Sequence, residues 1–485
     1  MSGFVNSVLS NCFLPCYTII YLKEFWGEMR SVKQKEQTMV RDLTNGNVVK
    51  LLLRFAFPLF ISNALQAIYN IVDMIVVGQF IGGTGMSAVS VGGDVLHLLT
   101  FLAMGFSAAG QVLIAQSVGA GRLDKVKKII GTMFTLMTSI AVVVAVVCFI
   151  LRKGILSWLN TPAEAYAFTM DYTVTCIVGL VFIYGYNIVS AILRGMGDSR
   201  RPFIFIAIAA VVNIVLDLVF VAVFGMEVFG AALATVISQA ISFISALIYL
   251  YRRKESFGFD FRLRSFAMDK AALAELLALG IPMAIQSAAI NISKIILASW
   301  INLHGVVYSA LAGIYNKINL MIGIVGNSFT TAGASMVGQN LGAKKFERVP
   351  VILRTVLLCT CLVATAVSLA LIFASEPIFA MFTSDETVLA VASILVAPAV
   401  VNIYGSATRS MSFSLINGSG NTRLNFAVAI IDGMISRVGI AALLGFAMQM
   451  GCRGFWFGDA LAGYMPLVIG MVYYLSGHWK TRAVK

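Results

Sequence analysis

Charged residues are scarce in this sequence: Asp, Glu, Lys and Arg make up 12% of the 485 residues, whereas hydrophobic residues make up 59%. The mean hydropathy is +0.90. A soluble protein keeps a large polar exterior because of its surface-to-volume ratio, so this composition excludes one. Apolar stretches of about 20 residues recur, each long enough to cross about 30 Å of hydrocarbon, and they rarely alternate as barrel strands do. The sequence therefore predicts an all-α membrane protein.

Several sequence motifs are also missing, and each absence excludes a class of function. The seven cysteines show no paired CxxC spacing, so neither a disulfide framework nor a zinc site is expected. No G-x-x-x-x-G-K-[ST] motif occurs, which excludes an ATPase engine. An intramembrane aspartyl protease would need G-x-G before its catalytic aspartates, but Asp73 follows Ile-Val and Asp217 follows Val-Leu. We therefore expect no enzymatic activity, no metal and no cofactor.

The lysines and arginines give the chain a net charge of +13, but their distribution does not favour a nucleic-acid partner. They lie mostly in alternate loops between the apolar stretches, whereas the opposite loops contain only Arg152, Lys153 and Arg453. By the positive-inside rule, the basic loops and both termini face the cytoplasm. The expected partners are the lipid bilayer and a small-molecule substrate, and a monomer is expected.

Apolar runs separated by Gly, Pro and charged residues predict twelve membrane-spanning helices. Several runs exceed the bilayer thickness, so tilting or protrusion is expected. The first six helices form an N-lobe (48–252), followed by a cytoplasmic linker (253–270), a C-lobe (271–478) and a cytoplasmic tail (479–485). The predicted spans are 48–80, 86–117, 127–151, 165–193, 202–224, 229–251, 271–303, 306–340, 347–375, 387–416, 425–449 and 454–477.

Residues 1–47 differ in composition from the rest of the chain. They contain one modest apolar run, Phe4–Leu22, followed by a polar stretch. No basic region precedes Lys23, as a signal peptide would require. We interpret residues 1–47 as an N-terminal extension, with the true start at Met29 or Met39. The alternative is an additional helix on the membrane surface.

The two predicted lobes are related in sequence, because four separate places in the chain repeat at a nearly constant offset. Six spans per half give both lobes the same orientation, so their pseudo-two-fold axis runs along the membrane normal. Secondary transporters often have this design, with the solute site between the halves. The matched pairs are 116–120 with 339–343 and 195–200 with 418–423, both offset by 223, and Pro58 with Pro282 and Gly230 with Gly454, both offset by 224.

Polar side chains inside the N-lobe spans are expensive to bury and are therefore candidate functional residues. At about 1.5 Å of rise per residue, Asp73 in the first span and Asp217 in the fifth both lie about 12 Å below the outer surface. Asn213 precedes Asp217 by one turn, and Thr235 in the sixth span reaches a similar depth. Buried carboxyl groups suit reversible protonation, and the same oxygens could instead bind Na⁺. We predict a cation site here; a purely structural hydrogen-bond cluster is the alternative.

The first span combines this aspartate with a proline. Gln66, Tyr69 and Asp73 are spaced i, i+3, i+7 and so share one face of the helix. Pro58 removes a backbone hydrogen bond two turns earlier and should kink the helix. A kinked helix that carries a titratable Asp73 could couple protonation to bending, whereas a kink that only serves packing is the alternative.

The second half does not repeat the acidic residues. At the 223 offset, Asp73 corresponds to Ile296 and Asp217 to Ile440, and basic residues are buried instead. Internal ion pairing is one interpretation of these bases. The other is a basic cavity wall that favours an anionic or zwitterionic solute. The basic residues are Lys294, Lys317 (the repeat equivalent of Asp94), Arg409 and Arg437, with Asp432 and Asp459 as candidate partners.

Five segments, each weak by itself, form a specific combination: Leu51–Leu59, Tyr69–Asp73, Gly195–Arg200, Asn213–Asp217 and Gly230–Thr235. Together they resemble the multidrug and toxic compound extrusion (MATE) family, in its prokaryotic DinF-like branch. The likeness covers about residues 42–478. It also favours Met39 as the start, because family members typically begin shortly before such a segment.

The resemblance implies twelve helices in two pseudo-symmetric six-helix lobes and a multi-pass protein of the bacterial cytoplasmic membrane. It implies export of organic solutes by antiport, with H⁺ or Na⁺ as the coupling ion and no other cofactor. The NorM-like branch has acidic cation-site residues in the second lobe, whereas this chain has Lys and Arg there. That departure puts a C-lobe Na⁺ site and the usual lipophilic-cation substrate in doubt.

The resemblance also implies roles for individual residues. Positions matching Asp73, Asn213, Asp217 and Thr235 bind the cation in DinF-like members. Positions like Gln66, Tyr69 and Asn187 face the substrate cavity in such members. The interpretation of a basic cavity wall adds Lys294, Lys317 and Arg409 to the residues predicted to line the cavity, and Pro58 is the predicted helix kink.

Two transport functions fit these observations. The first is a cation-coupled antiporter that exports small organic molecules or drugs by alternating access. The second is a flippase for lipid-linked oligosaccharide precursors, in which the basic second lobe would hold a pyrophosphate. Such flippases often have more than twelve spans, so the sequence favours the exporter.

Overall fold

The computed structural model describes residues 40–159, 161–383 and 385–481, and all regular secondary structure in this part of the chain is helical. The predictions for residues 1–39 and for residues 482–485 of the tail lie outside the described residues. Within the described part, twelve helical segments are long and apolar enough to cross a membrane. The predicted fold class, an all-α membrane protein with twelve transmembrane helices, is therefore confirmed.

The N-lobe helices begin and end within a few residues of the predicted spans, except at the end of the third. That helix continues past Arg152 and Lys153, because charged side chains interrupt an apolar run without ending a helix. The N-lobe elements are α3 (Val48–Ile81), α4 (Gly83–Gly119), α5 (Leu123–Trp158), η2 (Ala163–Ala165), α6 (Tyr166–Gly195), α7 (Arg200–Asp217), η3 (Leu218–Val223) and α8 (Glu227–Arg252).

The C-lobe follows a linker that contains α9 (Lys254–Phe257) and η4 (Leu263–Phe266). Its last spans are more broken than those of the N-lobe, with π-helical turns at η6 and η7. The C-lobe elements are α10 (Lys270–Asn302), α11 (Val306–Gly342), α12 (Arg348–Phe373), α13 (Ser375–Ala380), α14 (Glu386–Val391), η5 (Ala392–Leu395), α15 (Val396–Gly418), α16 (Thr422–Ile430), η6 (Ile431–Ser436), α17 (Arg437–Ala442), η7 (Leu443–Ala447), α18 (Gly451–Ala462), α19 (Met465–Leu475) and η8 (His478–Lys480).

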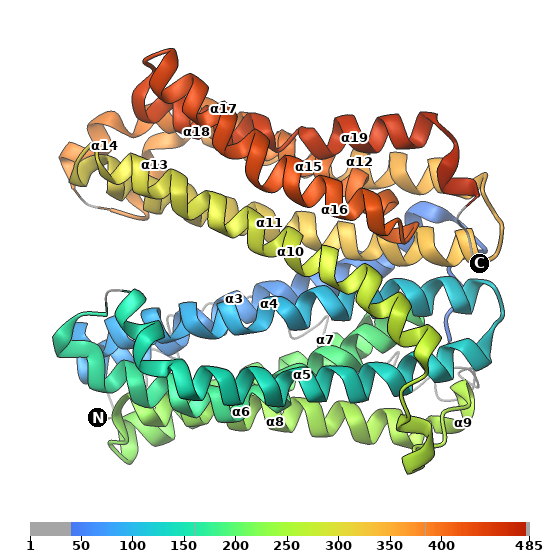
Figure 1. The fold of residues 1–485 in the computed structure, drawn as a ribbon. Coiled ribbons are helices and arrows are strands. Elements are labelled where there is room, and N and C mark those ends of the chain that lie inside the picture. Colours follow the sequence, from blue (N-terminus) through green and yellow to red (C-terminus); the bar gives the residue numbers. More distant parts are fainter. Residues whose placement is uncertain (1–39, 160, 384, 482–485) are drawn as a thin grey trace, which may run out of the picture. The chain divides into compact units, whose positions relative to one another are not determined.

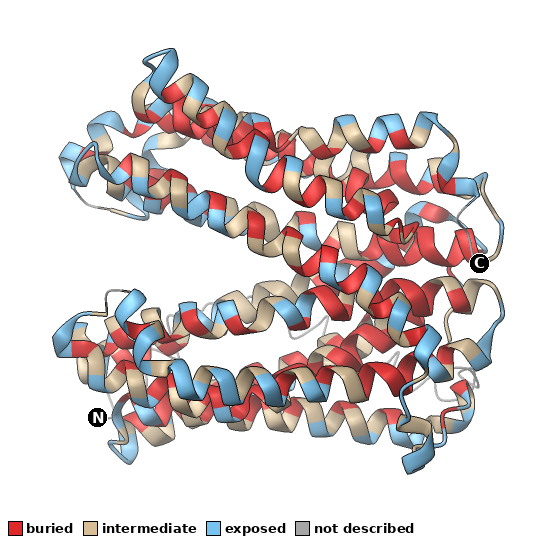
Figure 2. Ribbon diagram, viewed as in Figure 1, coloured by how far each residue is buried: buried red, intermediate tan, exposed pale blue. Residues whose placement is uncertain are grey.

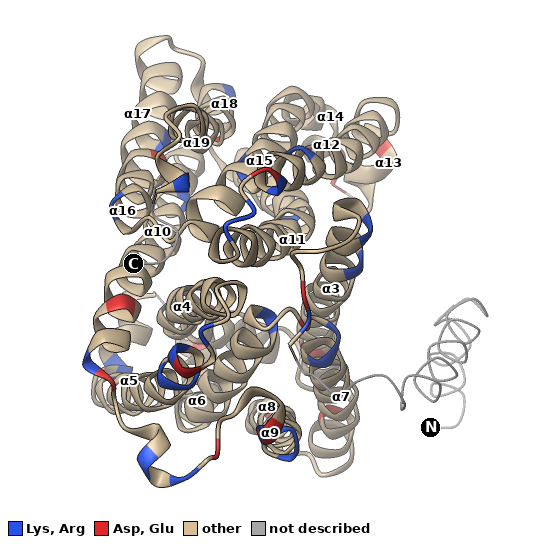
Figure 3. Cartoon of the chain, turned by 90° about the vertical axis from the view of Figure 1, so that its right-hand side faces the viewer, with Lys and Arg blue, Asp and Glu red and all other residues tan. Residues whose placement is uncertain are grey.

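Helices α3–α8 and helices α10–α19 form two groups that lie together at one end of the bundle and separate toward the other (Figure 1). We call the first the basic end; it carries the turns at 120–122, 196–199 and 343–347, and Lys and Arg are frequent there (Figure 3). Buried residues concentrate where the lobes meet (Figure 2), and residues 332–342 of α11 are all buried. The opposite end, where α5 ends at Trp158 and residues 303–305 form a turn, is the far end.

Glycine allows the backbones of the two lobes to meet at the basic end. A Cβ on Gly119 of α4 would overlap the carbonyl oxygen of Gln339, and a Cβ on Gly342 of α11 would overlap that of Gln116. The same two glutamines form reciprocal bonds: Gln116 Nε2 donates to the Gly418 carbonyl at 2.8 Å, and Gln339 Nε2 to the Gly195 carbonyl at 3.3 Å. The two bonds are related by the internal repeat, because Gln116 corresponds to Gln339 and Gly195 to Gly418.

Residues 40–47 pack against both lobes, which composition alone did not suggest. The Arg41 amide donates to the Met196 carbonyl in the N-lobe at 2.8 Å. The Leu43 amide donates to Gln339 Oε1 in the C-lobe at 3.0 Å, and Leu43 is buried. Asn47 then caps α3 by accepting a hydrogen bond from the Lys50 amide. The segment thus ties the two lobes together before the first helix begins.

The linker makes a corresponding connection before α10. Asp269 caps α10 and its amide donates to Thr132 Oγ1 of α5 at 3.1 Å. Lys128 lies 3.1 Å from the Asp269 carboxylate. Hydrogen bonds from the Ala272 amide and from Lys128 hold the pKa of Asp269 below its usual value. Each lobe is therefore joined to the other by the segment that precedes its first helix.

We expect Gly119→Ala to destabilise the protein, because the added Cβ must push the α4 and α11 backbones apart. Overpacking of this kind costs about 1–3 kcal/mol. Gly154→Ala is the matched control, since no atom lies within 4 Å of a Cβ at that helical position. Thermal unfolding in detergent should show a lower midpoint for Gly119→Ala only; equal midpoints for the two variants would contradict the close contact.

Candidate functional site

The four predicted cation-site residues come together inside the N-lobe. Asp73 comes from α3, Asn213 and Asp217 from α7, and Thr235 from α8, and all four are buried. Asp217 is the last residue of α7, where the helix widens into the π-helical turn η3. Such turns are often found at functional sites because they redirect side chains. The four side chains, which were predicted to lie at one depth in the membrane, therefore also lie close together.

The side chains of this N-lobe cluster contact one another. Thr235 Oγ1 donates to Asp73 Oδ2 at 3.3 Å, and Asn213 Nδ2 lies 3.5 Å from Thr235 Oγ1. The carboxyl groups of Asp73 and Asp217 are close enough to interact directly. Two acidic groups from two helices therefore share one buried space.

The cluster has more acceptors than donors. The Oδ1 atoms of Asp73 and Asn213 and both carboxyl oxygens of Asp217 are buried, and no donor of any described residue bonds to them. Buried polar atoms are normally hydrogen-bonded. Asp and Asn oxygens can be satisfied by a proton carried on a carboxyl group, or by a hard cation such as Na⁺. The composition of the cluster therefore suits either ion.

Three further residues border the N-lobe cluster and were not predicted. Tyr172 and Cys176 of α6 are buried close enough to Asp73 for their charges to interact. Gln239 of α8 donates to Tyr69 Oη at 3.4 Å. Gln239 could have been found, because it follows Thr235 by one turn on the same helix face. Tyr172 and Cys176 give no such signal, since nothing in their sequence context links them to α3.

The other predicted N-lobe residues do not join the cluster. Gln66 and Asn187 are half-buried, and the Asn187 amide donates to the Ile183 carbonyl of its own helix at 2.9 Å. Pro58 lies within α3, which continues as one helix through it. Its carbonyl accepts a hydrogen bond from Ser62 Oγ at 2.8 Å.

The buried bases of the C-lobe form a network with the two candidate acids. Arg437 pairs with both Asp432, at 3.4 Å, and Asp459. Arg409 lies 3.0 Å from Asp432. Tyr315 Oη donates to the other carboxylate oxygen of Asp459 at 3.3 Å. The interpretation of internal ion pairing therefore holds for Arg409 and Arg437.

Lys294 and Lys317 have no ion pair within 4 Å among the described residues, and both side chains are exposed. Lys294, on α10, lines a small cavity together with residues of α11 and α18. Lys317, on α11, is near enough to Asp94 of the N-lobe for their charges to interact. The prediction that these two lysines are buried is therefore wrong, and they are exposed charges on the first two helices of the C-lobe.

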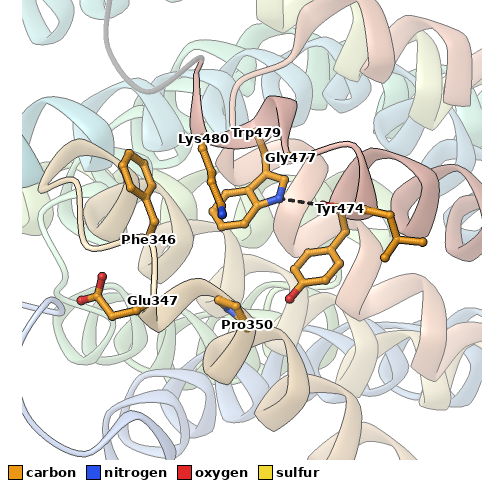
Figure 4. Close-up of a pocket in the computed structure, with 8 residues that line it drawn as sticks. Phe346, Glu347, Pro350, Tyr474, Gly477, Trp479 and Lys480 are labelled. Carbon is orange, nitrogen blue, oxygen red and sulfur yellow. Dashed lines mark hydrogen bonds between the residues drawn. The ribbon is translucent and has the colours of Figure 1, made fainter.

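A larger hollow, of about 530 Å³, lies at the basic end between α12 and the segment after α19. Its wall includes Phe346, Pro350 and Trp479, and Trp479 Nε1 donates to the Tyr474 carbonyl at 3.0 Å (Figure 4). None of the predicted site residues lines it. It is therefore separate from the candidate site.

No group of three or more His, Cys, Asp or Glu side chains that could hold a metal occurs in residues 40–159, 161–383 and 385–481. One G-x-G-D sequence is present, at Gly195–Asp198. Its Asp198 accepts hydrogen bonds from the amides of Arg200 and Arg201 in the turn after α6. That aspartate therefore has a structural role.

Comparison with known proteins gave consistent matches along the chain. The family model MatE matches residues 58–219 and 282–443, one segment in each lobe. A probable multidrug resistance protein of Bacillus subtilis, YoeA, is 26% identical over 455 residues, which cover 93% of this chain and 98% of that protein. A probable multidrug resistance protein of Thermotoga maritima, NorM, is 24% identical and covers 90% of this chain and 94% of its own length.

The structural comparison agrees with the sequence matches. A crystal structure of MATE in the bent conformation superposes with a TM-score of 0.82 at 22% identity, over 91% of this chain and 98% of that one. At this identity the likeness concerns the fold alone. It supports the two-lobe arrangement of twelve helices described above.

We expect Arg437→Met to be strongly destabilising, because it leaves Asp432 and Asp459 buried without their shared guanidinium. Breaking a buried ion pair on one side costs about 3–5 kcal/mol. The double variant Arg437→Met/Asp459→Leu should recover part of that loss, since it removes one of the unpaired charges as well. The measurement is thermal unfolding of the purified protein in detergent.

Arg453→Met is the matched control, because Arg453 is an exposed arginine of the same lobe with no carboxylate within 4 Å among the described residues. Substitutions at such surface positions usually change stability by at most about 0.5 kcal/mol. An Arg437→Met protein as stable as the control would show that the network does not contribute to stability.

Proposed function

The chain belongs to the MatE family, and on that premise we propose that it exports small organic molecules, including drugs, across the cytoplasmic membrane of a bacterium. Export is driven by antiport against H⁺ or Na⁺, through alternating access of one monomer. Curated relatives of the chain carry the description multidrug resistance protein, which supports this class of substrate.

The observation that carries the proposal is the pair of buried carboxyl groups, Asp73 and Asp217, in a cluster with unsatisfied oxygens. Two unit charges about 4 Å apart repel by about 4 kcal/mol at an effective dielectric constant of 20, so both carboxyls cannot stay ionised without a counter-charge. A bound H⁺ or Na⁺ supplies that charge. The pair of carboxyl groups therefore favours a site that binds a cation to balance its negative charge.

Cation binding at Asp73 acts on a helix that touches both lobes. The outer half of α3 holds Asp73 in the N-lobe cluster, whereas Asn63 nearer the basic end donates to Ser328 Oγ of α11 at 3.1 Å. Neutralising Asp73 changes its hydrogen bonds to Thr235 and its repulsion with Asp217. A shift of α3, with Pro58 as its weak point, would carry that change to the interface between the lobes.

We assign the basic end to the cytoplasm by the positive-inside rule, with both termini on that side. The lobes meet at this end, so the conformation described corresponds to the outward-facing state. Opening to the cytoplasm would break the reciprocal bonds of Gln116 and Gln339 and separate residues 40–47 from one lobe. A membrane potential of about 100 mV supplies about 2.3 kcal/mol for each charge carried inward, enough to sustain a solute gradient of about 50-fold.

We expect Asp73→Asn and Asp217→Asn each to abolish uphill export, because an amide neither carries the proton nor balances a cation. The accumulated gradient should fall by up to about 50-fold, the gradient that one coupled charge supports at about 100 mV. Efflux of a fluorescent dye from energised cells, at matched expression, is the measurement. Asp171→Asn, which changes an exposed acid of α6, is the control and should export normally.

The coupling ion is decided separately, in proteoliposomes that contain the full chain. If H⁺ is the coupling ion, an imposed pH gradient in Na⁺-free buffer drives dye movement; if Na⁺ is, a Na⁺ gradient at constant pH does so. Either response should disappear in Asp217→Asn. Dye movement that continues undiminished in that variant would contradict coupling through the N-lobe cluster.

A further inference from the structure

Five charged side chains meet in the C-lobe within its membrane-spanning helices. They come from α10 (Lys294), α15 (Arg409), η6 (Asp432), α17 (Arg437) and α18 (Asp459). Three are basic and two are acidic, so one positive charge has no counter-charge inside the cluster. Ionisable residues within membrane-spanning segments are rare and usually mark a solute pathway.

The ion pairs identify which base is left over. Asp432 contacts both Arg409 and Arg437, and Asp459 contacts Arg437. Lys294 is influenced by these charges but pairs within 4 Å with no acid of the described residues. The surplus charge is therefore the ammonium group of Lys294, and the arginines already balance the two acids.

The internal repeat explains why the acids need no further cation. At the offset of 224 that relates Gly230 to Gly454, Asn213 corresponds to Arg437, Asp217 to Ala441 and Thr235 to Asp459. The guanidinium of Arg437 thus stands at the C-lobe equivalent of the N-lobe cluster, as a permanently attached cation. A mobile H⁺ or Na⁺ has no role there, and Lys294 is not required as a counter-ion.

Lys294 lines a cavity together with Trp456, whose indole N–H is an unsatisfied donor. The cavity, of about 20 Å³, is bordered by Lys294 and by Tyr315, Trp456 and Asp459. The indole N–H of Trp456 is buried and bonds to no acceptor among the described residues. Indole nitrogen can only donate. An exposed ammonium group with no ion pair and a buried indole N–H with no acceptor thus line one cavity, and an anionic oxygen would bond to both.

The carboxylate of Asp459 borders the same cavity but does not close it to an anion. One of its oxygens pairs with Arg437 and the other accepts from Tyr315 Oη at 3.3 Å. Its charge is therefore balanced and both of its oxygens are engaged. The cavity has room for about one water-sized group, so an incoming carboxylate would insert one oxygen.

Resting on the function proposed above, we propose that this cavity binds a carboxylate group of the exported solute. Lys294 forms the ion pair and Trp456 Nε1 donates a hydrogen bond, while the rest of the solute stays outside the cavity. The substrates preferred by this transporter are then organic acids or zwitterions. Solutes that carry only positive charge lack the group that this site recognises.

The experiment measures binding of two matched dyes to the full chain in lipid nanodiscs. The dyes are one xanthene fluorophore as its free carboxylic acid and as its methyl ester, which differ only in the carboxylate. Fluorescence anisotropy should give at least about 10-fold tighter binding of the acid, as expected for a charge-assisted hydrogen bond. Lys294→Met should remove this preference, and Lys294→Arg should keep most of it.

Arg453→Met is the control for loss of a positive charge, because this exposed arginine lies on α18 near Trp456 and outside the cavity. It should retain the preference for the acid, whereas Trp456→Phe should weaken it a few-fold. Equal affinities of the native protein for acid and ester would overturn the proposal. So would a preference in Lys294→Met as large as in Arg453→Met, or no binding of the acid at millimolar concentration.

Asp217→Asn separates this proposal from the function on which it rests. If coupled export is correct, this variant loses uphill transport but still binds the acid in preference to the ester. Acid-selective binding without any coupled export by the native protein would overturn the exporter and leave the carboxylate site standing. Coupled export by the native protein with equal binding of acid and ester would support the exporter and overturn the carboxylate site.

Discussion

A charge inside a membrane-spanning bundle needs a counter-charge, and the two lobes meet that requirement in different ways. In the C-lobe, Arg409 and Arg437 pair with Asp432 and Asp459 and balance them permanently. In the N-lobe, Asp73 and Asp217 face each other with no base among their described contacts. Burial of such a pair is tolerable only when a proton or a cation is present. The C-lobe arrangement is therefore balanced by its own residues, whereas under the proposed function the N-lobe arrangement depends on an ion that can leave.

The interface between the lobes, unlike the lobe interiors, has equivalent residues on its two sides. Gly119 and Gly342 allow the same close backbone approach from opposite sides, and the paired bonds of Gln116 and Gln339 are repeat equivalents. The interface therefore keeps the internal symmetry, whereas the lobe interiors do not.

The sequence predicted much of this arrangement, and its failures have physical reasons. The twelve spans and the two lobes followed from long apolar runs and a constant repeat offset, because lipid forces each span to be apolar along its length. The approach of Asp73, Asn213, Asp217 and Thr235 followed from counting depth along helices. Depth says nothing about rotation around the helix axis, however. Tyr172 was missed for that reason, and Lys294 could not be distinguished from the paired bases Arg409 and Arg437.

The difference between the lobe interiors determines how binding of the cation and binding of the solute would be coupled. The N-lobe cluster and the C-lobe network are built from different helices, so a cation and an acidic solute would not compete for the same atoms. Their coupling would instead have to pass through helices that contact both lobes. The helix α3 satisfies this condition, since it carries Asp73 and also bonds to α11 through Asn63. Because α11 also borders the cavity of Lys294 with Tyr315, one continuous set of packed helices joins the two sites.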